Sequence, residues 1–292
     1  MSTIPRVSSA VPGEPAHFGS VLAHQPLLAA RFGEAYGAFW NSDLVSARTK
    51  ELCRMRNARI TQCGFCRQVR FDKPFREGLD EAAIADVTDD YAQSDVLSVA
   101  EKAALRFTDA LIHDPALFDG TARAELHRHF TPAQIEELGI GIAMFLALAK
   151  VLITLGLEPD EMGTTVLPTP QLAETTGDRP LSVLFDEFAE AARTGLDPVI
   201  AAAVTERIAQ IHAGPIAPLG DGAGIRDLLP FVDNLPFAHH TISDEQAAAA
   251  RDALGEEGFV ALAVHAALSD ARCRLDPVMQ AVERPAEAIP AS

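Results

Sequence analysis

The chain has 292 residues, of which 48% are hydrophobic and 22% charged, so it is long enough for two ordinary domains that each bury a core. Its formal net charge of −17 argues against a nucleic acid or an anionic membrane as a partner, because both would repel an acidic surface.

The N-terminal stretch has a single arginine and no apolar run, so it does not read as a secretory signal. The most apolar stretch, residues 140–157, is interrupted by Lys150 and Gly156, and we do not expect it to cross a membrane. We therefore expect a cytoplasmic protein. In that reducing compartment, closely spaced cysteines are more often catalytic or metal-binding than structural.

Residues 1–25 contain three prolines and scattered polar residues, so we expect an N-terminal arm. A helix should begin at Pro26, because Leu28, Phe32, Tyr36 and Trp40 are four residues apart. We interpret this aromatic stripe as packing against the next helix rather than as a cofactor site.

A second helix is expected over residues 44–60, and it is the most basic part of an acidic chain. Its cations are interpreted as a solvated face or as partners of nearby acids: Arg48, Lys50, Arg54, Arg56 and Arg59. A third helix should begin at Cys63 and continue past Arg70 to Gly78, with a kink or early end at Pro74.

Capping signals mark the next helices. Asp80 should cap a short helix, and Ser98 with Glu101 forms a capping box for a helix over residues 98–112. Thr131 and the proline after it begin a long helix, residues 132–155, that is apolar on most sides and therefore central. Because no convincing alternation with a period of two appears, we predict an all-α fold without strands.

Proline and glycine cluster over residues 168–181, which we interpret as a linker between a helical domain at 26–167 and a second one at 182–280. Helices are expected over the second domain, and residues 281–292 should form a flexible tail. The expected helices are 182–193, 198–212, 243–254 and 256–275.

The two domains share an apolar spacing. A shift of 124 positions pairs Phe107 with Phe231, Asp109 with Asp233 and Lys150 with Arg274. We interpret this as a tandem duplication whose second copy is degenerate and lacks the cysteine pair. The alternative is two helical domains with similar apolar spacing. In either case we expect Asp109 and Asp233 to have a structural role, such as pairing at a helix end or an interface.

The strongest chemical motif is the Cys63-Gly64-Phe65-Cys66 pair. At a helix start, backbone N–H groups favour a thiolate over a thiol. Arg70 would share the helix face of both cysteines and add a cation, and Glu51 on the preceding helix could accept a thiol proton. One thiolate would attack an oxidant, and the other would resolve the product to a disulfide.

Other interpretations of the pair remain open. A structural zinc site needs four ligands, and only Cys53 and Cys273 are further thiols, with no histidine near the pair. A thioredoxin-type domain needs strands on both sides of a helix. The pair could also be buried and inert. His127 and His129 point to different sides of a helix and make a poor metal site, and His239-His240 is interpreted as a loop position. No phosphate-binding glycine motif is present, so no metal or cofactor is expected.

Glu51, Cys63 and Cys66 at these spacings, with the sequence TPAQIEELGIGIAMFLALAKVLITLG, resemble the carboxymuconolactone decarboxylase family in its alkylhydroperoxidase D-like branch. The resemblance covers residues 26–160 well and the remainder weakly. It implies an all-α helical bundle that assembles into homo-oligomers, and a peroxidase or thiol–disulfide oxidoreductase activity with an external dithiol as reductant.

By the same resemblance, Cys66 would pass through a sulfenic acid, Cys63 would donate a proton and resolve it, and Glu51 would start the proton relay. The family motif usually has a histidine where this chain has Arg70. A guanidinium stays protonated, so it can stabilise a thiolate but cannot shuttle a proton. Two other functions therefore remain: a non-redox enzyme that binds a small lactone or carboxylic acid at Arg70, and a non-catalytic binding or assembly protein.

Overall fold

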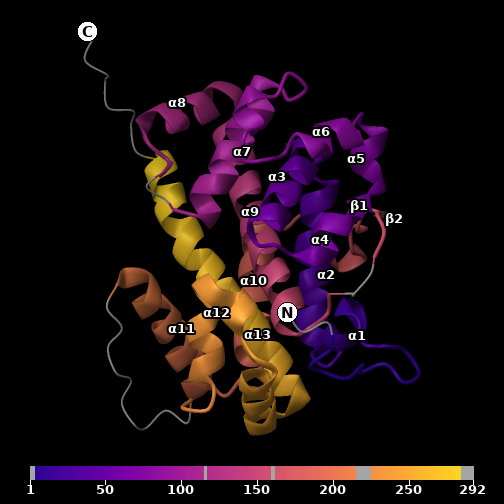
Figure 1. The fold of residues 1–292 in the computed structure, drawn as a ribbon, viewed down its shortest axis with the longest axis vertical. Coiled ribbons are helices and arrows are strands. Elements are labelled where there is room, and N and C mark those ends of the chain that lie inside the picture. The colour runs from indigo at the N-terminus through magenta and orange to yellow at the C-terminus, as the bar shows by residue number, and fades with distance from the viewer. Residues whose placement is uncertain (1–3, 115–116, 159–161, 215–224, 284–292) are drawn as a thin grey trace.

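The computed structural model describes residues 4–114, 117–158, 162–214 and 225–283. These residues form a helical bundle with one short sheet, which confirms the all-α prediction (Figure 1). The tail expected at 281–292 lies outside the described residues from position 284 onward.

The first half of the bundle contains nine helices among the described residues: α1 Phe18–Leu22, α2 Pro26–Asn41, α3 Ala47–Ile60, α4 Gly64–Gln68, α5 Asp72–Arg76, α6 Glu81–Ala85, α7 Val99–Ile112, α8 Gly120–His129 and α9 Pro132–Thr154. The second half contributes α10 Leu181–Thr194, α11 Pro198–Ala213, α12 Leu229–Ala238 and α13 Asp244–Glu283.

The expected helix starts are confirmed where a side chain caps them. The hydroxyl of Ser98 accepts from the N–H of Glu101, and Glu101 bonds back to the N–H of Ser98. Thr131 and Gln134 form the same box before α9. These local bonds satisfy free N–H groups of the first turn, which is why sequence alone located them.

The segment after the cysteine pair differs from the prediction. The helix begun at Cys63 ends at Gln68, and Val69–Phe71 forms strand β1 in parallel with β2, Thr165–Leu167. Pro74 lies in the first turn of α5, where a missing N–H costs nothing. The prediction of a continuous helix without strands is wrong here, because pairing with a distant segment overrides the local pattern.

The long helix α9 is central, as expected. By length and composition it could cross a membrane, but 94% of its most apolar window is buried inside the molecule, so it is a core helix. It packs against α3, α7 and α13 (Figure 1). The junction expected between residues 254 and 256 is confirmed as a kink in α13 at Gly255, where φ is 70°, a backbone conformation that favours glycine.

The two halves have related contacts. α3 packs against α7 and α9, and α11 packs against α12 and α13. α2 packs against α10. Asp109 accepts a 2.6 Å bond from Arg56, and Asp233 accepts one of 2.6 Å from Arg207. The structural pairing expected of both aspartates is thus confirmed. These parallels support the tandem duplication, which remains a prediction.

One apolar core crosses the expected domain boundary, with buried members from Val7 to Val282. The expected linker is also anchored, because Thr169 donates its hydroxyl to Asp72 at 2.7 Å. In the N-terminal arm, the guanidinium of Arg6 is buried and donates to the carbonyls of Thr154 and Ile242. The described parts of the arm and of the linker are therefore packed against the helical bundle.

Candidate dithiol site

Cys63 and Cys66 lie at the start of α4 with their sulfur atoms 2.6 Å apart. Cys63 occupies the N-cap, and its sulfur accepts the Cys66 N–H at 3.2 Å. Both are free thiols in the structure. Because the sulfurs are already adjacent, a disulfide between them requires only a small side-chain movement.

The two thiols have different surroundings. Cys63 is fully buried, whereas Cys66 keeps 9% of its surface exposed. Burial raises the pKa of the Cys63 thiol well above its usual value, and the neighbouring Cys66 and the carboxylate of Glu158 raise it further. Glu158 lies against this turn, since it accepts the Gly64 N–H. Cys63 therefore keeps its proton and donates it toward the Cys66 sulfur.

Glu51 lies fully buried on α3 and is held by Arg54, whose Nε and Nη2 donate to its two oxygens at 2.8 and 2.5 Å. Arg54 also donates to the Cys66 carbonyl at 3.0 Å and to the Val69 carbonyl at 2.5 Å. Among the described residues, no hydrogen bond joins Glu51 to either sulfur. The arginine thus connects Glu51 to the cysteine turn.

Arg70 lies elsewhere. Because α4 ends at Gln68, Arg70 falls on β1 and not on the helix face of the cysteines. Its Nε donates to Glu81 at 3.0 Å and its Nη1 to the Arg67 carbonyl at 2.7 Å. The expectation that Arg70 shares a face with the pair is wrong; Arg54 is the cation beside Cys66. A carboxylic acid bound at Arg70 would have to displace Glu81.

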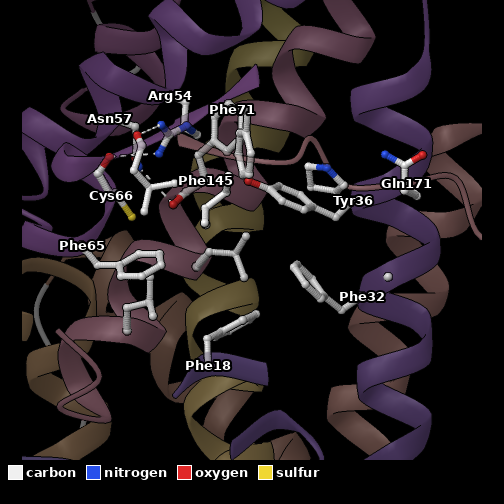
Figure 2. A pocket seen from close by; sticks show the side chains of 16 residues that line it. Phe18, Phe32, Tyr36, Arg54, Asn57, Phe65, Cys66, Phe71, Phe145 and Gln171 are labelled. Carbon is white, nitrogen blue, oxygen red and sulfur yellow. Dashed lines mark hydrogen bonds between the residues drawn. The ribbon is translucent and has the colours of Figure 1, made fainter. Parts of the chain in front are cut away.

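Cys66 opens into a cavity of about 390 Å³ between the helices. Figure 2 shows Cys66 and Phe65 on one side and Phe32 and Tyr36 from α2 on the other. Its walls are mainly apolar and come from α1, α2, α3, α4, α9 and both strands: Phe18, Phe32, Tyr36, Phe65, Val69, Phe71, Phe145, Leu148, Leu152 and Leu167. Half of the stripe interpreted as packing, Phe32 and Tyr36, therefore lines this cavity.

Four polar side chains line the same cavity as Cys66: Asn57, Tyr36, Arg54 and Gln171. Asn57 is buried, and its Nδ2 donates to the Phe145 carbonyl at 3.0 Å, but its Oδ1 has no partner within the described part of the chain. Burial raises the pKa of Tyr36, so its hydroxyl keeps its proton. Arg54 and Gln171 are the other two.

The remaining candidates lie outside the cavity. Burial raises the pKa of Cys53 to about 12, so it stays a thiol. His127 contacts the Val282 carbonyl at 3.1 Å, and His239 and His240 form a short 3₁₀ turn, not a loop. Over the described residues, no group of three metal-binding side chains occurs.

The basic helix is confirmed as a set of partners rather than a solvated face. Each cation on α3 bonds to another element or to Glu51: Arg48 to Glu101, Lys50 to Glu137, Arg54 to Glu51, Arg56 to Asp109 and Arg59 to the Ile84 carbonyl.

Sequence reasoning missed Arg54, Asn57 and Tyr36 as site residues. Arg54 and Asn57 follow Glu51 at three and six residues on the same helix, a spacing that places Glu51 and Arg54 on one face. Tyr36 carries no local signal, because only the packing of α2 across α9 brings it to Cys66.

No family model matches this chain. Two uncharacterized proteins, from two strains of Mycobacterium tuberculosis, are each 33% identical to it over 110 residues. The match covers 38% of this chain and 38% of the length of each relative.

Proposed function

We propose that the protein is a thiol oxidoreductase that reduces an organic hydroperoxide or a disulfide through Cys66 and Cys63. The observation that carries the proposal is the pairing of a cavity-facing thiol with a fully buried one 2.6 Å behind it. A nucleophile at a cavity and a resolving thiol within bonding reach are the two groups that such a cycle needs.

The Cys66 thiolate attacks the outer peroxide oxygen, the O–O bond breaks, and the products are a Cys66 sulfenic acid and an alkoxide that takes up a proton. The Cys63 sulfur then displaces the hydroxyl as water and forms the disulfide. An external dithiol returns both cysteines to thiols and becomes a disulfide itself. A cytoplasmic dithiol system would supply these electrons.

Arg54 and Tyr36 would assist the first step. The guanidinium of Arg54 stabilises negative charge on Cys66, and the protonated Tyr36 hydroxyl is a hydrogen-bond donor for the developing alkoxide. Glu51 binds Arg54 through both oxygens, so we assign it the positioning of Arg54 rather than the transfer of a proton.

The cavity favours a substrate with a bulky apolar group. Its apolar walls would bury that group, and the free Oδ1 of Asn57 would accept the hydroperoxide O–H. We therefore expect cumene hydroperoxide to react with a higher kcat/KM than hydrogen peroxide.

The proposal is tested by peroxide consumption coupled to a dithiol reductant. Cys66→Ser should abolish turnover, and Cys63→Ser should permit one oxidation of Cys66 without recycling, while Cys273→Ser should behave as wild type. Mass spectrometry should find one disulfide between Cys63 and Cys66 after mild oxidation. Turnover retained in Cys66→Ser would rule the proposal out.

The same proposal places the chain in the alkylhydroperoxidase D-like branch of the carboxymuconolactone decarboxylase family. It is supported by the Glu51, Cys63 and Cys66 spacing on an all-α bundle. The homo-oligomer implied by this placement would be seen by sedimentation of the intact chain.

A further inference from the structure

A second cavity, of about 190 Å³, is lined by residues other than those of the dithiol cavity. Two cations line it, Lys150 from α9 and Arg274 from α13, and both are almost fully buried. Apart from Thr61, its remaining walls are apolar or carry histidine, and they include Ile112, Leu146, Phe237 and His239. Among the described lining residues none is acidic.

The cations share one counter-charge. Asp270 is fully buried. It accepts a hydrogen bond of 2.5 Å from Lys150 Nζ and one of 3.0 Å from Arg274 Nε. Both cations also donate to the Pro236 carbonyl, at 2.7 and 2.9 Å. Across the described contacts of this cluster, two buried positive charges face one carboxylate.

Such a buried excess charge is costly without a further anion. Consistent with it, burial lowers the pKa of Lys150 to about 8 even though Asp270 is beside it. His239 also lines the cavity and is nine-tenths buried; its Nε2–H donates to the Thr61 carbonyl at 3.3 Å, so its Nδ1 is an acceptor.

We propose that this cavity binds a small carboxylate with a short apolar chain. The carboxylate would balance the second cation by bonding to Lys150 and Arg274, which retain N–H donors beyond the bonds described. The apolar walls would bury the chain. The volume suits such a ligand, since it is several times the roughly 30 Å³ share of one water molecule.

The test is thermal unfolding of the full-length protein at pH 7 in a buffer without carboxylate. Butyrate should raise the Tm by several degrees in a saturable manner, because a ligand that binds only the folded state stabilises it. Butyramide, of the same shape but neutral, should not. If inorganic phosphate raised the Tm as much as butyrate does, the assignment to a carboxylate with an apolar chain would be overturned.

Two variants locate the effect. Lys150→Met leaves Asp270 and Arg274 as a balanced pair, so it should fold and lose the response to butyrate, whereas Cys273→Ser should keep it. Phe237→Ala removes an exposed aromatic ring from the cavity wall. It should weaken the binding of butyrate more than the binding of formate. If Lys150→Met does not fold, Phe237→Ala tests the proposal. A preference for butyrate over formate that is the same in Phe237→Ala as in wild type would overturn the proposed site. The readout does not depend on the dithiol chemistry.

Discussion

At the scale of single residues, the proposed chemistry depends on which cation lies beside Cys66. Arg54 donates to the Cys66 carbonyl and lines its cavity, whereas Arg70 is bound to Glu81. Removing Arg54 alone would leave Glu51 buried without a partner, at a cost of about 3–5 kcal/mol. The charge effect is therefore best isolated by replacing both residues of the pair.

We expect the double variant Glu51→Gln/Arg54→Met to slow the alkylation of Cys66 at pH 7 by about tenfold, because the stabilising cation is lost. Arg70→Met should leave the rate within about twofold of wild type. Iodoacetamide labelling followed by mass spectrometry measures both, and circular dichroism verifies folding. A larger effect from Arg70→Met than from the double variant would contradict the assignment.

The buried His239 leads to a prediction of how the stability of the fold depends on pH. Burial and, to a lesser extent, the charge of Lys150 lower its pKa to about 3. Below about pH 6.5 the unfolded chain binds a proton that the folded chain does not, so stability falls as the pH falls from 6.5 toward 3. The slope from this one group is about 1.4 kcal/mol per pH unit.

His239→Phe should therefore lose about 2 kcal/mol less than wild type between pH 6.5 and pH 5. Urea unfolding at several pH values measures this difference. Equal slopes in wild type and His239→Phe would show that this histidine is not held neutral.

At the scale of elements, close approach of helices depends on Gly141. A Cβ built at this position of α9 would lie 2.2 Å from the Phe39 ring of α2. Phe39 is itself buried among Trp40 and Phe145, so it cannot move aside freely. The α2–α9 contact that forms one wall of the dithiol cavity therefore requires glycine here.

Gly141→Ala should destabilise the protein by about 1–3 kcal/mol, as overpacking of a core does. The matched control is Gly33→Ala on α2, where nothing lies within 4 Å of the added Cβ; it should be neutral or stabilising by up to about 1 kcal/mol. Thermal and urea unfolding compare the two. Equal stability of both variants would show that α2 and α9 tolerate wider spacing.

At the scale of the whole molecule, α9 is shared between the halves. It packs against α3 and α7 on one side and against α13 on the other, and the buried pair Lys150–Asp270 crosses from α9 to α13. The first half therefore cannot bury its central helix alone, even though it contains all of the dithiol residues.

A chain that ends at residue 167 should fail to unfold cooperatively as a monomer, because one face of α9 would meet water and Lys150 would lose Asp270. Sedimentation and circular dichroism measure assembly and folding. A monomer with a sharp thermal transition would contradict this view and support an independent first domain.

Sequence by itself determined the local features: the capped helix starts at Ser98 and Thr131, the break at Gly255 and the central position of α9. Each depends on residues within a few positions of one another. It also located Cys63, Cys66 and Glu51. Only tertiary structure decided that Val69–Phe71 pairs with Thr165–Leu167, that Arg54 rather than Arg70 lies beside Cys66, and that two cations converge on Asp270. These outcomes depend on contacts between distant segments, which no local spacing encodes.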